Sequence, residues 1–166
     1  MYWNGYGPDY SGRKRIETGD EMKMDLLYRK AVPQDSQEIA RLSGQLGYPA
    51  KAEQIEARLA PILNAAEHVM IVAEAQGKLV GWIHAHGRLL VESPPYAEIG
   101  GLVVDQDFRG KRIGKQLVRH CEEWGRTKGY QELRVRVNVT REKAHLFYKH
   151  AGFENTKTQQ VFRKGL

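Results

Sequence analysis

A basic segment with two glycines, residues 109–115, stands between a buried strand and an amphipathic helix. The start of a helix presents free backbone N–H groups and a positive dipole end, which suit a phosphate or pyrophosphate group. Gly110 and Gly114 would let the backbone approach such an anion closely, and positive charge comes from Arg109, Lys111, Arg112 and Lys115. An ordinary basic helix start is the alternative interpretation. The segment is neither a Walker A loop nor a Rossmann fingerprint, because it lacks both glycine patterns.

A second block of residues lies further along the chain, where Val137-Asn138 is followed by Ala144–Phe153 and ends in Tyr-x-x-x-Gly-Phe. The two blocks together resemble the signatures of the GNAT superfamily of N-acetyltransferases, over about residues 26–166. The acetyl-CoA motif of that family is Gln/Arg-x-x-Gly-x-Gly/Ala. Arg109 and Gly114 match it, Arg112 replaces the middle glycine, and Arg141 stands where many members have a second Asn.

The resemblance implies an α/β (mixed α+β) fold with acetyl-CoA as the cofactor and CoA as a product. It predicts a mixed, mostly antiparallel sheet of six to seven strands with about four helices, splayed between the fourth and fifth strands. The cofactor-binding residues that it implies are Leu102, Val103, Val104, Arg109, Gly110, Lys111, Arg112, Ile113, Gly114, Lys115, Asn138 and Arg141.

Glu98 is the candidate general base, since amide formation from a thioester needs the amine to be neutral when it attacks. By resemblance, the histone-modifying branch of the family has a catalytic glutamate at the matching place on this strand. The glycine pair Gly100-Gly101 predicts a β-bulge, because glycine weakens a regular strand. The N–H of Leu102 or Val103 would then face the thioester carbonyl and stabilise the oxyanion. An exposed strand-end carboxylate and a packing pair of glycines are the alternatives.

Tyr148 is the candidate acid for the departing thiolate. It lies two turns into a helix that begins at Arg141, and by resemblance it is the family tyrosine near the thioester sulfur. The alternative role is a core aromatic residue, as expected for Phe147. His145, one turn earlier, is a weaker candidate for proton relay.

Three residues are candidates for contact with the acceptor substrate: Tyr48 in a loop between two helices, and Trp82 and His84 on one strand. His84 and His86 alternate on one strand face, but no third ligand is evident, so we predict no metal site. Cys121 falls on a buried helix face and has no expected catalytic role.

The elements that position these residues follow from hydrophobic periodicity. We expect a first helix that follows turn and N-cap residues 33–36, carries Ile39, Leu42 and Leu46 at helical spacing and stops at Gly47. We expect three further helices, over about Lys51–Asn64, Arg112–Lys128 and Arg141–His150. We expect strands over Leu26–Ala31, Val69–Ala75, Lys78–His86, Tyr96–Asp105 and Glu132–Asn138, with one or two more in residues 153–164. Residues 89–95 are predicted to be a connection.

Composition indicates one globular domain, residues 22–166, in a chain of 166 residues. Residues 1–21 lack periodicity and are interpreted as an accessory tail; the alternative is an arm that docks on the domain. No apolar stretch is long enough to span a bilayer, no signal peptide is evident, and the single cysteine excludes an internal disulfide, so we expect a cytoplasmic protein with no membrane contact.

The charge is unevenly distributed along the chain. Residues 1–100 carry 11 basic and 13 acidic side chains, whereas residues 101–166 carry 15 and 7, so an anionic ligand would be attracted to the C-terminal part. Nucleic acid, a phosphorylated cofactor and a solvated basic face are all compatible with this distribution.

The sequence therefore predicts an acetyl-CoA-dependent N-acetyltransferase acting on a small primary amine by direct attack. A protein amine is the alternative acceptor, because the excess of acid before Ala97 favours a cationic small molecule only slightly. A non-catalytic CoA sensor and an RNA-binding module are the alternatives of a different class, although nucleic acid is disfavoured because charge and glycine gather at one helix start. A homodimer is left open.

Overall fold

The computed structural model describes residues 13–15 and 25–166. A six-stranded sheet runs in the order β1-β2-β3-β4-β5-β6. Its strands are β1 (Arg13–Arg15), β2 (Asp25–Lys30), β3 (His68–Ala75), β4 (Lys78–Leu90), β5 (Ser93–Val104) and β6 (Leu133–Val135). All neighbours are antiparallel except β5 and β6. This is the mixed, mostly antiparallel sheet that the sequence predicts.

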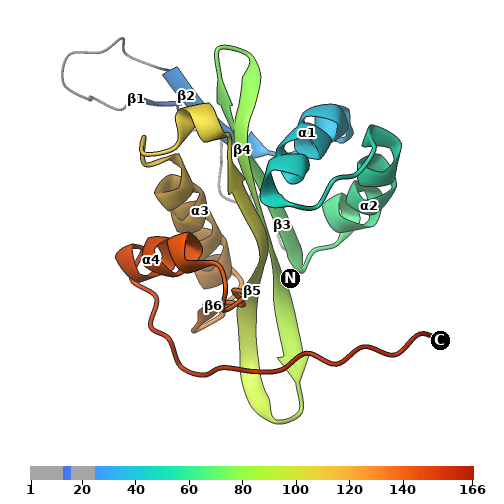
Figure 1. Cartoon of the computed structure of the whole chain (residues 1–166), viewed down its shortest axis with the longest axis vertical. Coiled ribbons are helices and arrows are strands. Elements are labelled where there is room, and N and C mark those ends of the chain that lie inside the picture. Colours follow the sequence, from blue (N-terminus) through green and yellow to red (C-terminus); the bar gives the residue numbers. More distant parts are fainter. Residues whose placement is uncertain (1–12, 16–24) are drawn as a thin grey trace, which may run out of the picture.

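Helices cover both faces of the sheet (Figure 1). Helices α1 (Ser36–Leu46) and α2 (Ala52–Asn64) lie on one face, and α3 (Ile113–Thr127) and α4 (Glu142–His150) lie on the other. Short 3₁₀ turns, η1 (Pro33–Asp35) and η2 (Gln106–Phe108), lead into α1 and α3. The four helices lie where apolar periodicity predicts them.

Two hydrophobic clusters separate the faces. One packs Leu117 and Cys121 of α3 against Ile83 of β4, and the other packs Leu42 and Leu59 of α1 and α2 beneath the opposite face. These side chains are at most 3% exposed, so the clusters form two dry layers. The sheet is therefore packed tightly on both faces, with a separate apolar cluster on each.

Three expectations about strands need correction. Residues 89–95 are not a free connection, because β4 and β5 extend into a long hairpin that contains Pro94 and Pro95. Those prolines are tolerated because β6 pairs with β5 only at residues 97–99, so the second edge of β5 needs no N–H donor there. The strand predicted over residues 132–138 shrinks to β6.

The prediction of one or two strands within residues 153–164 was wrong. Residues 153–166 contain no helix or strand, and Val161 and Phe162 are 85% and 88% exposed. The run from Glu154 to Gln160 is polar throughout, so it has no alternating apolar face to bury against β6. The sixth strand of the sheet is instead β1, which pairs with β2 through Arg13, Lys14 and Arg15.

The rest of the predicted tail, residues 1–12 and 16–21, lies outside the described residues. Within the described ranges, no helix has both the length and the apolar character needed to cross a membrane.

Candidate active site

The centre of the candidate site is a bulge in β5. His84 of β4 pairs with Gly101 and Ala85 pairs with Ile99, so Gly100 is the additional residue. The pairing of β5 with β6 stops at Ile99, beside the same bulge. Beyond that point residues 101–104 pair with β4 alone, and alternate N–H groups of such a strand point away from its partner. The predicted bulge and the predicted splay are both confirmed.

Both glycines of the bulge are also required by close packing. A Cβ on Gly100 would lie 3.0 Å from Nδ1 of His84, and one on Gly101 would lie 2.9 Å from the ring of Trp82. Bulge formation and packing are therefore not alternatives here. Trp82, 8% exposed, carries a buried Nε1 with no hydrogen-bond partner in the described part of the chain.

Glu98 is buried, with 7% of its surface exposed, rather than an exposed strand end. Its Oε1 accepts a hydrogen bond of 2.8 Å from the guanidinium of Arg136 and lies 3.9 Å from Nε2 of His86. His86 is its cross-strand partner on β4, so the two side chains share the face covered by α1 and α2. The hydrogen bond to Glu98, together with its negative charge, raises the pKa of Arg136.

Tyr148 lies on the other face of the sheet. It is half-buried against the α3 cluster, and its ring stands edge-on to Phe147 and Phe153 with centroids 5.1 and 5.3 Å apart. Burial, with a smaller contribution from Cys121, raises its pKa to about 12, so the hydroxyl keeps its proton at neutral pH. Glu98 and Tyr148 thus approach the splay from opposite faces.

The loop before α3 has the features of an anion site. Gly110 has φ of +79°, and no atom lies within 4 Å of the position where a Cβ would stand. Arg112, with φ of +61°, is the N-cap of α3 and is exposed. A cavity of about 330 Å³ opens beside this helix start, lined by Arg112, Lys115, Gln116 and Arg119. Positive charge, open backbone and a helix N-terminus therefore coincide.

The remaining members of the predicted loop have structural contacts. Nε of Arg109 donates to the carbonyl of Val104 over 3.2 Å, and Lys111 lies over the ring of Phe108. A Cβ on Gly114 would meet the ring of Phe147 at 3.0 Å. Gly114 therefore lets α4 pack closely against α3. Ile113, 1% exposed, is a core residue of the same helix start.

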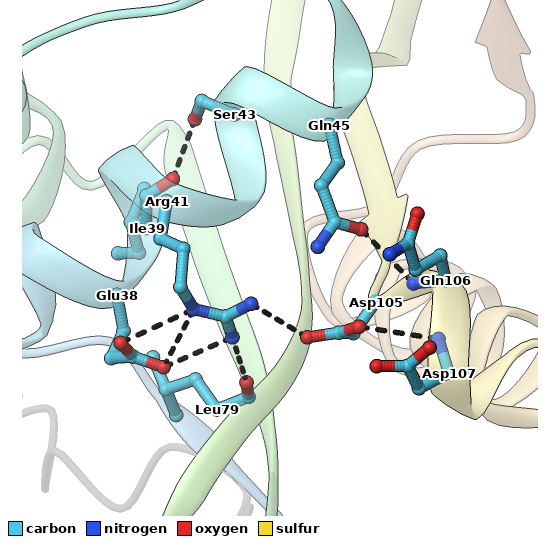
Figure 2. A network of polar contacts seen from close by, with 9 residues as sticks. All are labelled: Glu38, Ile39, Arg41, Ser43, Gln45, Leu79, Asp105, Gln106 and Asp107. Atoms are coloured by element: carbon cyan, nitrogen blue, oxygen red, sulfur yellow. Dashed lines mark hydrogen bonds and ion pairs between the residues drawn. The ribbon is translucent and has the colours of Figure 1, made fainter.

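Figure 2 shows a network of hydrogen bonds and ion pairs that connects α1 to residues 105–107, directly before the basic loop. Arg41 donates to the carboxylates of Asp105 at 2.6 Å and Glu38 at 3.0 Å, and to the carbonyl of Leu79 at 2.9 Å. Gln45 of α1 accepts from the N–H of Gln106 at 3.0 Å. The network fixes where β5 ends and where the loop begins.

Asn138 and Arg141 do not lie on the loop before α3. The side chain of Asn138 accepts hydrogen bonds from Thr140, and its carbonyl lies 3.0 Å from Nε2 of His145. Arg141 donates to the carbonyl of Leu46 at 2.9 Å, and its guanidinium lies 5.7 Å from the centre of the Tyr48 ring. Arg141 therefore joins the start of α4 to the loop between α1 and α2, and Tyr48 is exposed beside it.

Comparison with known proteins decides the family. Residues 35–153 match the acetyltransferase (GNAT) family. The chain belongs to this family. As a GNAT acetyltransferase it is an acyltransferase that uses acetyl-CoA.

Several GNAT relatives are named for small amines. An aminoglycoside N(6')-acetyltransferase of Stenotrophomonas maltophilia is 28% identical over 83% of this chain and 92% of its own length. An aminoalkylphosphonate N-acetyltransferase of Salmonella typhimurium is 31% identical over 69% of this chain and 73% of its own length. An uncharacterised N-acetyltransferase of Methanocaldococcus jannaschii is 33% identical, but the match spans only 42% of that protein.

The GNAT fold is equally clear among solved structures. The aminoglycoside N-acetyltransferase AAC(6')-Iy, in complex with CoA, superposes with a TM-score of 0.78 at 22% identity over 86% of this chain and 97% of that one. This likeness concerns the fold.

Sequence reasoning missed four residues that contact the candidate site: Arg41, Asp105, Arg136 and His68, whose Nδ1 lies 3.0 Å from Nε2 of His84. Each acts through a partner far away in the sequence, such as Asp105 for Arg41 and Glu98 for Arg136. An isolated charged residue at helical or strand spacing resembles an ordinary solvated one. The local sequence held no signal for these contacts.

Proposed function

We propose that this GNAT enzyme acetylates a primary amine of a small molecule by direct attack within a ternary complex. The observation that carries the proposal is the buried carboxylate of Glu98, two residues from the Gly100 bulge and on the face opposite α3. Bound acetyl-CoA supplies the acetyl group as a thioester. The cofactor and the acceptor then approach the splay from different faces, which direct attack requires.

The loop before α3 fits the diphosphate of the cofactor. Gly110 leaves its backbone open, and Arg112 and Lys115 line the adjacent cavity. Arg109, Lys111 and Gly114 complete the predicted loop, with Gly114 contributing only backbone. A helix N-terminus and basic side chains stabilise phosphate together.

The open side of β5 fits the acetyl arm. Because residues 102–104 pair only with β4, one of the N–H groups of Leu102 and Val103 points toward the side that β6 leaves free. A fixed N–H donor there would stabilise the oxyanion that forms during attack.

Glu98 binds the cationic amine and removes a proton from it. Its present partner, Arg136, has a side chain that is 58% exposed, so the guanidinium can move into water when an ammonium group takes its place. An amine beside Glu98 meets His86 and His84 on the same sheet face. Trp82, with its unpaired Nε1–H, and Tyr48, on the loop held by Arg141, extend the surface available to the acceptor.

Tyr148 donates its proton to the departing thiolate. A thiol has a reference pKa of about 8.5, so its thiolate is a tolerable leaving group in water. In a desolvated cleft the charge of the thiolate is costly, and a nearby O–H donor lowers that cost. The raised pKa of Tyr148 keeps this donor protonated at neutral pH.

A small-molecule acceptor is supported by the names of the relatives, which include aminoglycoside and aminoalkylphosphonate acetyltransferases. The test is a turnover screen of the purified chain with acetyl-CoA and four amine classes: aminoglycosides, aminoalkylphosphonates, polyamines and lysine peptides. Free thiol and acetylated product are both measured. We expect turnover with a non-peptide class. Turnover confined to peptides would assign a protein acceptor, and tight acetyl-CoA binding without any turnover would indicate a sensor.

A further inference from the structure

Three histidine rings lie against one another on the sheet face that carries Glu98; His68 stacks on His84 and on His86, and the rings of His84 and His86 are tilted. His68 of β3 lies opposite His86 of β4, and His84 stands two residues before His86. Their ring centroids are 5.3 to 5.6 Å apart. Nδ1 of His68 lies 3.0 Å from Nε2 of His84, which is hydrogen-bond distance. Within the described residues no group of three or more His, Cys, Asp or Glu is arranged to hold a metal ion.

His84 connects the bulge to His68. Its Nε2 contacts His68, while its Nδ1 faces Gly100, where a Cβ would stand only 3.0 Å away. A neutral imidazole carries a proton on one nitrogen and a lone pair on the other. If Nε2 of His84 donates to Nδ1 of His68, then Nδ1 of His84 presents its lone pair to the bulge.

The surroundings of His84 keep it neutral. Burial, with smaller effects from the charges of His68 and His86, lowers its pKa to about 4. Burial and the charge of His86 also lower the pKa of His68, while Glu67 opposes that shift. On the neighbouring strands, Glu98 faces His86 and is paired with Arg136.

A histidine that resists charging can still pass a proton. It accepts the proton on one nitrogen while it releases another from the opposite nitrogen, so no lasting charge forms on the buried ring. His68 is half-buried, next to the exposed Glu67, and so provides an outlet to water.

Acetylation of a primary ammonium requires such an outlet. The nitrogen loses two protons between ammonium and amide, and Glu98 accounts for one of them. We propose that His84 and His68 form a proton relay that carries the other proton from the Gly100 bulge to solvent, a proposal that rests on the acetyl transfer proposed above.

The step balances as follows. The amine nitrogen forms a bond to the carbonyl carbon, and its proton moves to Nδ1 of His84. The Nε2–H bond of His84 breaks as a proton joins Nδ1 of His68, and His68 releases its own Nε2 proton to water. The C–S bond breaks, the thiolate takes the proton of Tyr148, and Tyr148 regains one from water. Between turnovers Glu98 releases its proton to water, and proton exchange with water restores the starting tautomers of His84 and His68.

The first test needs no substrate. Nitrogen-15 NMR of the histidine rings in the cofactor-free wild-type protein reports which ring nitrogen carries the proton. We expect His84 to be protonated at Nε2 and bare at Nδ1 at neutral pH. A proton on Nδ1 of His84 would overturn the relay, because no lone pair would then face the bulge.

The second test is kinetic and uses His68→Phe, which keeps a stacked ring and removes both nitrogens. We expect kcat to fall roughly 10²-fold at neutral pH, the lower end of general base effects. The loss should shrink as pH rises and the amine arrives neutral, and acetyl-CoA affinity should not change. His150→Phe, the same substitution at an exposed residue that ends α4, is the control and should behave like wild type.

The outcomes separate the two proposals. Wild-type turnover together with an unchanged kcat and pH profile in a folded His68→Phe variant would overturn the relay alone. Absence of thiol release by the wild type with every amine class would overturn the proposed function, and the relay with it. If His68→Phe does not fold, the tautomer of His84 measured by NMR in the wild-type protein decides whether the relay is retained.

Discussion

The guanidinium of Arg41 lies 2.6 Å from the carboxylate of Asp105, which joins α1 to the last turn before the basic loop (Figure 2). Asp105 is 2% exposed, and its second oxygen accepts from the N–H of Asp107. Burial alone would raise the pKa of Asp105, but the hydrogen bonds from Arg41 and Asp107 outweigh it and lower the pKa below its usual value. The buried negative charge of Asp105 is therefore compensated by Arg41, a residue of α1 that it meets only in the folded chain.

Arg41→Met should lower the free energy of unfolding by about 3 kcal/mol, because it leaves a buried carboxylate without its cation. Chemical denaturation at pH 7 measures this. Since the pKa of Asp105 is lowered in the folded state, its contribution is complete above about pH 4 and is lost as pH falls through the lowered folded value. The difference between wild type and Arg41→Met should narrow on acidification, first as the uncompensated carboxylate of the variant takes up a proton and then, below about pH 4, as the wild type loses the contribution of Asp105. A constant difference would show that Asp105 is not the group involved.

Gly110→Val should weaken acetyl-CoA binding by about tenfold or more, equivalent to about 1.4 kcal/mol. Gly110 has φ of +79°, which a β-branched residue resists, and a side chain would cover the open backbone. Isothermal titration calorimetry gives the affinity. Unchanged acetyl-CoA affinity in a folded Gly110→Val variant would show that the diphosphate does not bind at this loop.

Gly114 provides a contrasting case in the same loop. Gly114→Ala should lower the melting temperature, because its Cβ would meet Phe147 at 3.0 Å. Phe147→Leu in the same chain should restore much of that stability and leave acetyl-CoA affinity close to wild type. If the double variant is stable but binds acetyl-CoA more weakly than the wild type, then residue 114 itself lies against the phosphates of the cofactor.

Glu98→Gln should reduce kcat by roughly 10²–10⁴-fold, the usual range for a lost general base. The amide keeps the shape and can still accept from Arg136, so the melting temperature should change little. Arg134→Gln is a matched control, because Arg134 is the β6 residue in register with Glu98 but pairs with Glu132. If turnover at neutral pH survives Glu98→Gln, the carboxylate only positions Arg136 and His86.

Tyr148→Phe should lower kcat and leave acetyl-CoA affinity unchanged, because it removes the hydroxyl and keeps the ring contacts with Phe147 and Phe153. Loss restricted to kcat marks an interaction made in the transition state. Single-turnover kinetics would establish that chemistry is the slow step. If chemistry is rate-limiting and wild type and Tyr148→Phe have equal kcat, Tyr148 has only a packing role.

Much of the fold followed from periodicity in the sequence. Ile39 and Leu42 in α1, and Leu117 and Cys121 in α3, recur at helical spacing and lie in the two buried layers. The glycine pair at residues 100–101 predicted the bulge because glycine weakens a regular strand, and the structure shows that close packing against His84 and Trp82 favours the same glycines. The C-terminal strands were wrong because strand pairing depends on a partner edge, and local sequence does not specify one.

The sequence by itself determined the helices, the bulge and the basic loop, since each depends on the chemistry of neighbouring residues. Only the tertiary structure decided what those features contact. It paired Glu98 with Arg136, turned Arg141 toward Leu46, and brought His68 within 3.0 Å of His84 from 16 residues away. Contacts of this kind form when strand register and helix packing bring distant side chains together, and a single charged or imidazole side chain carries no local mark of its eventual partner.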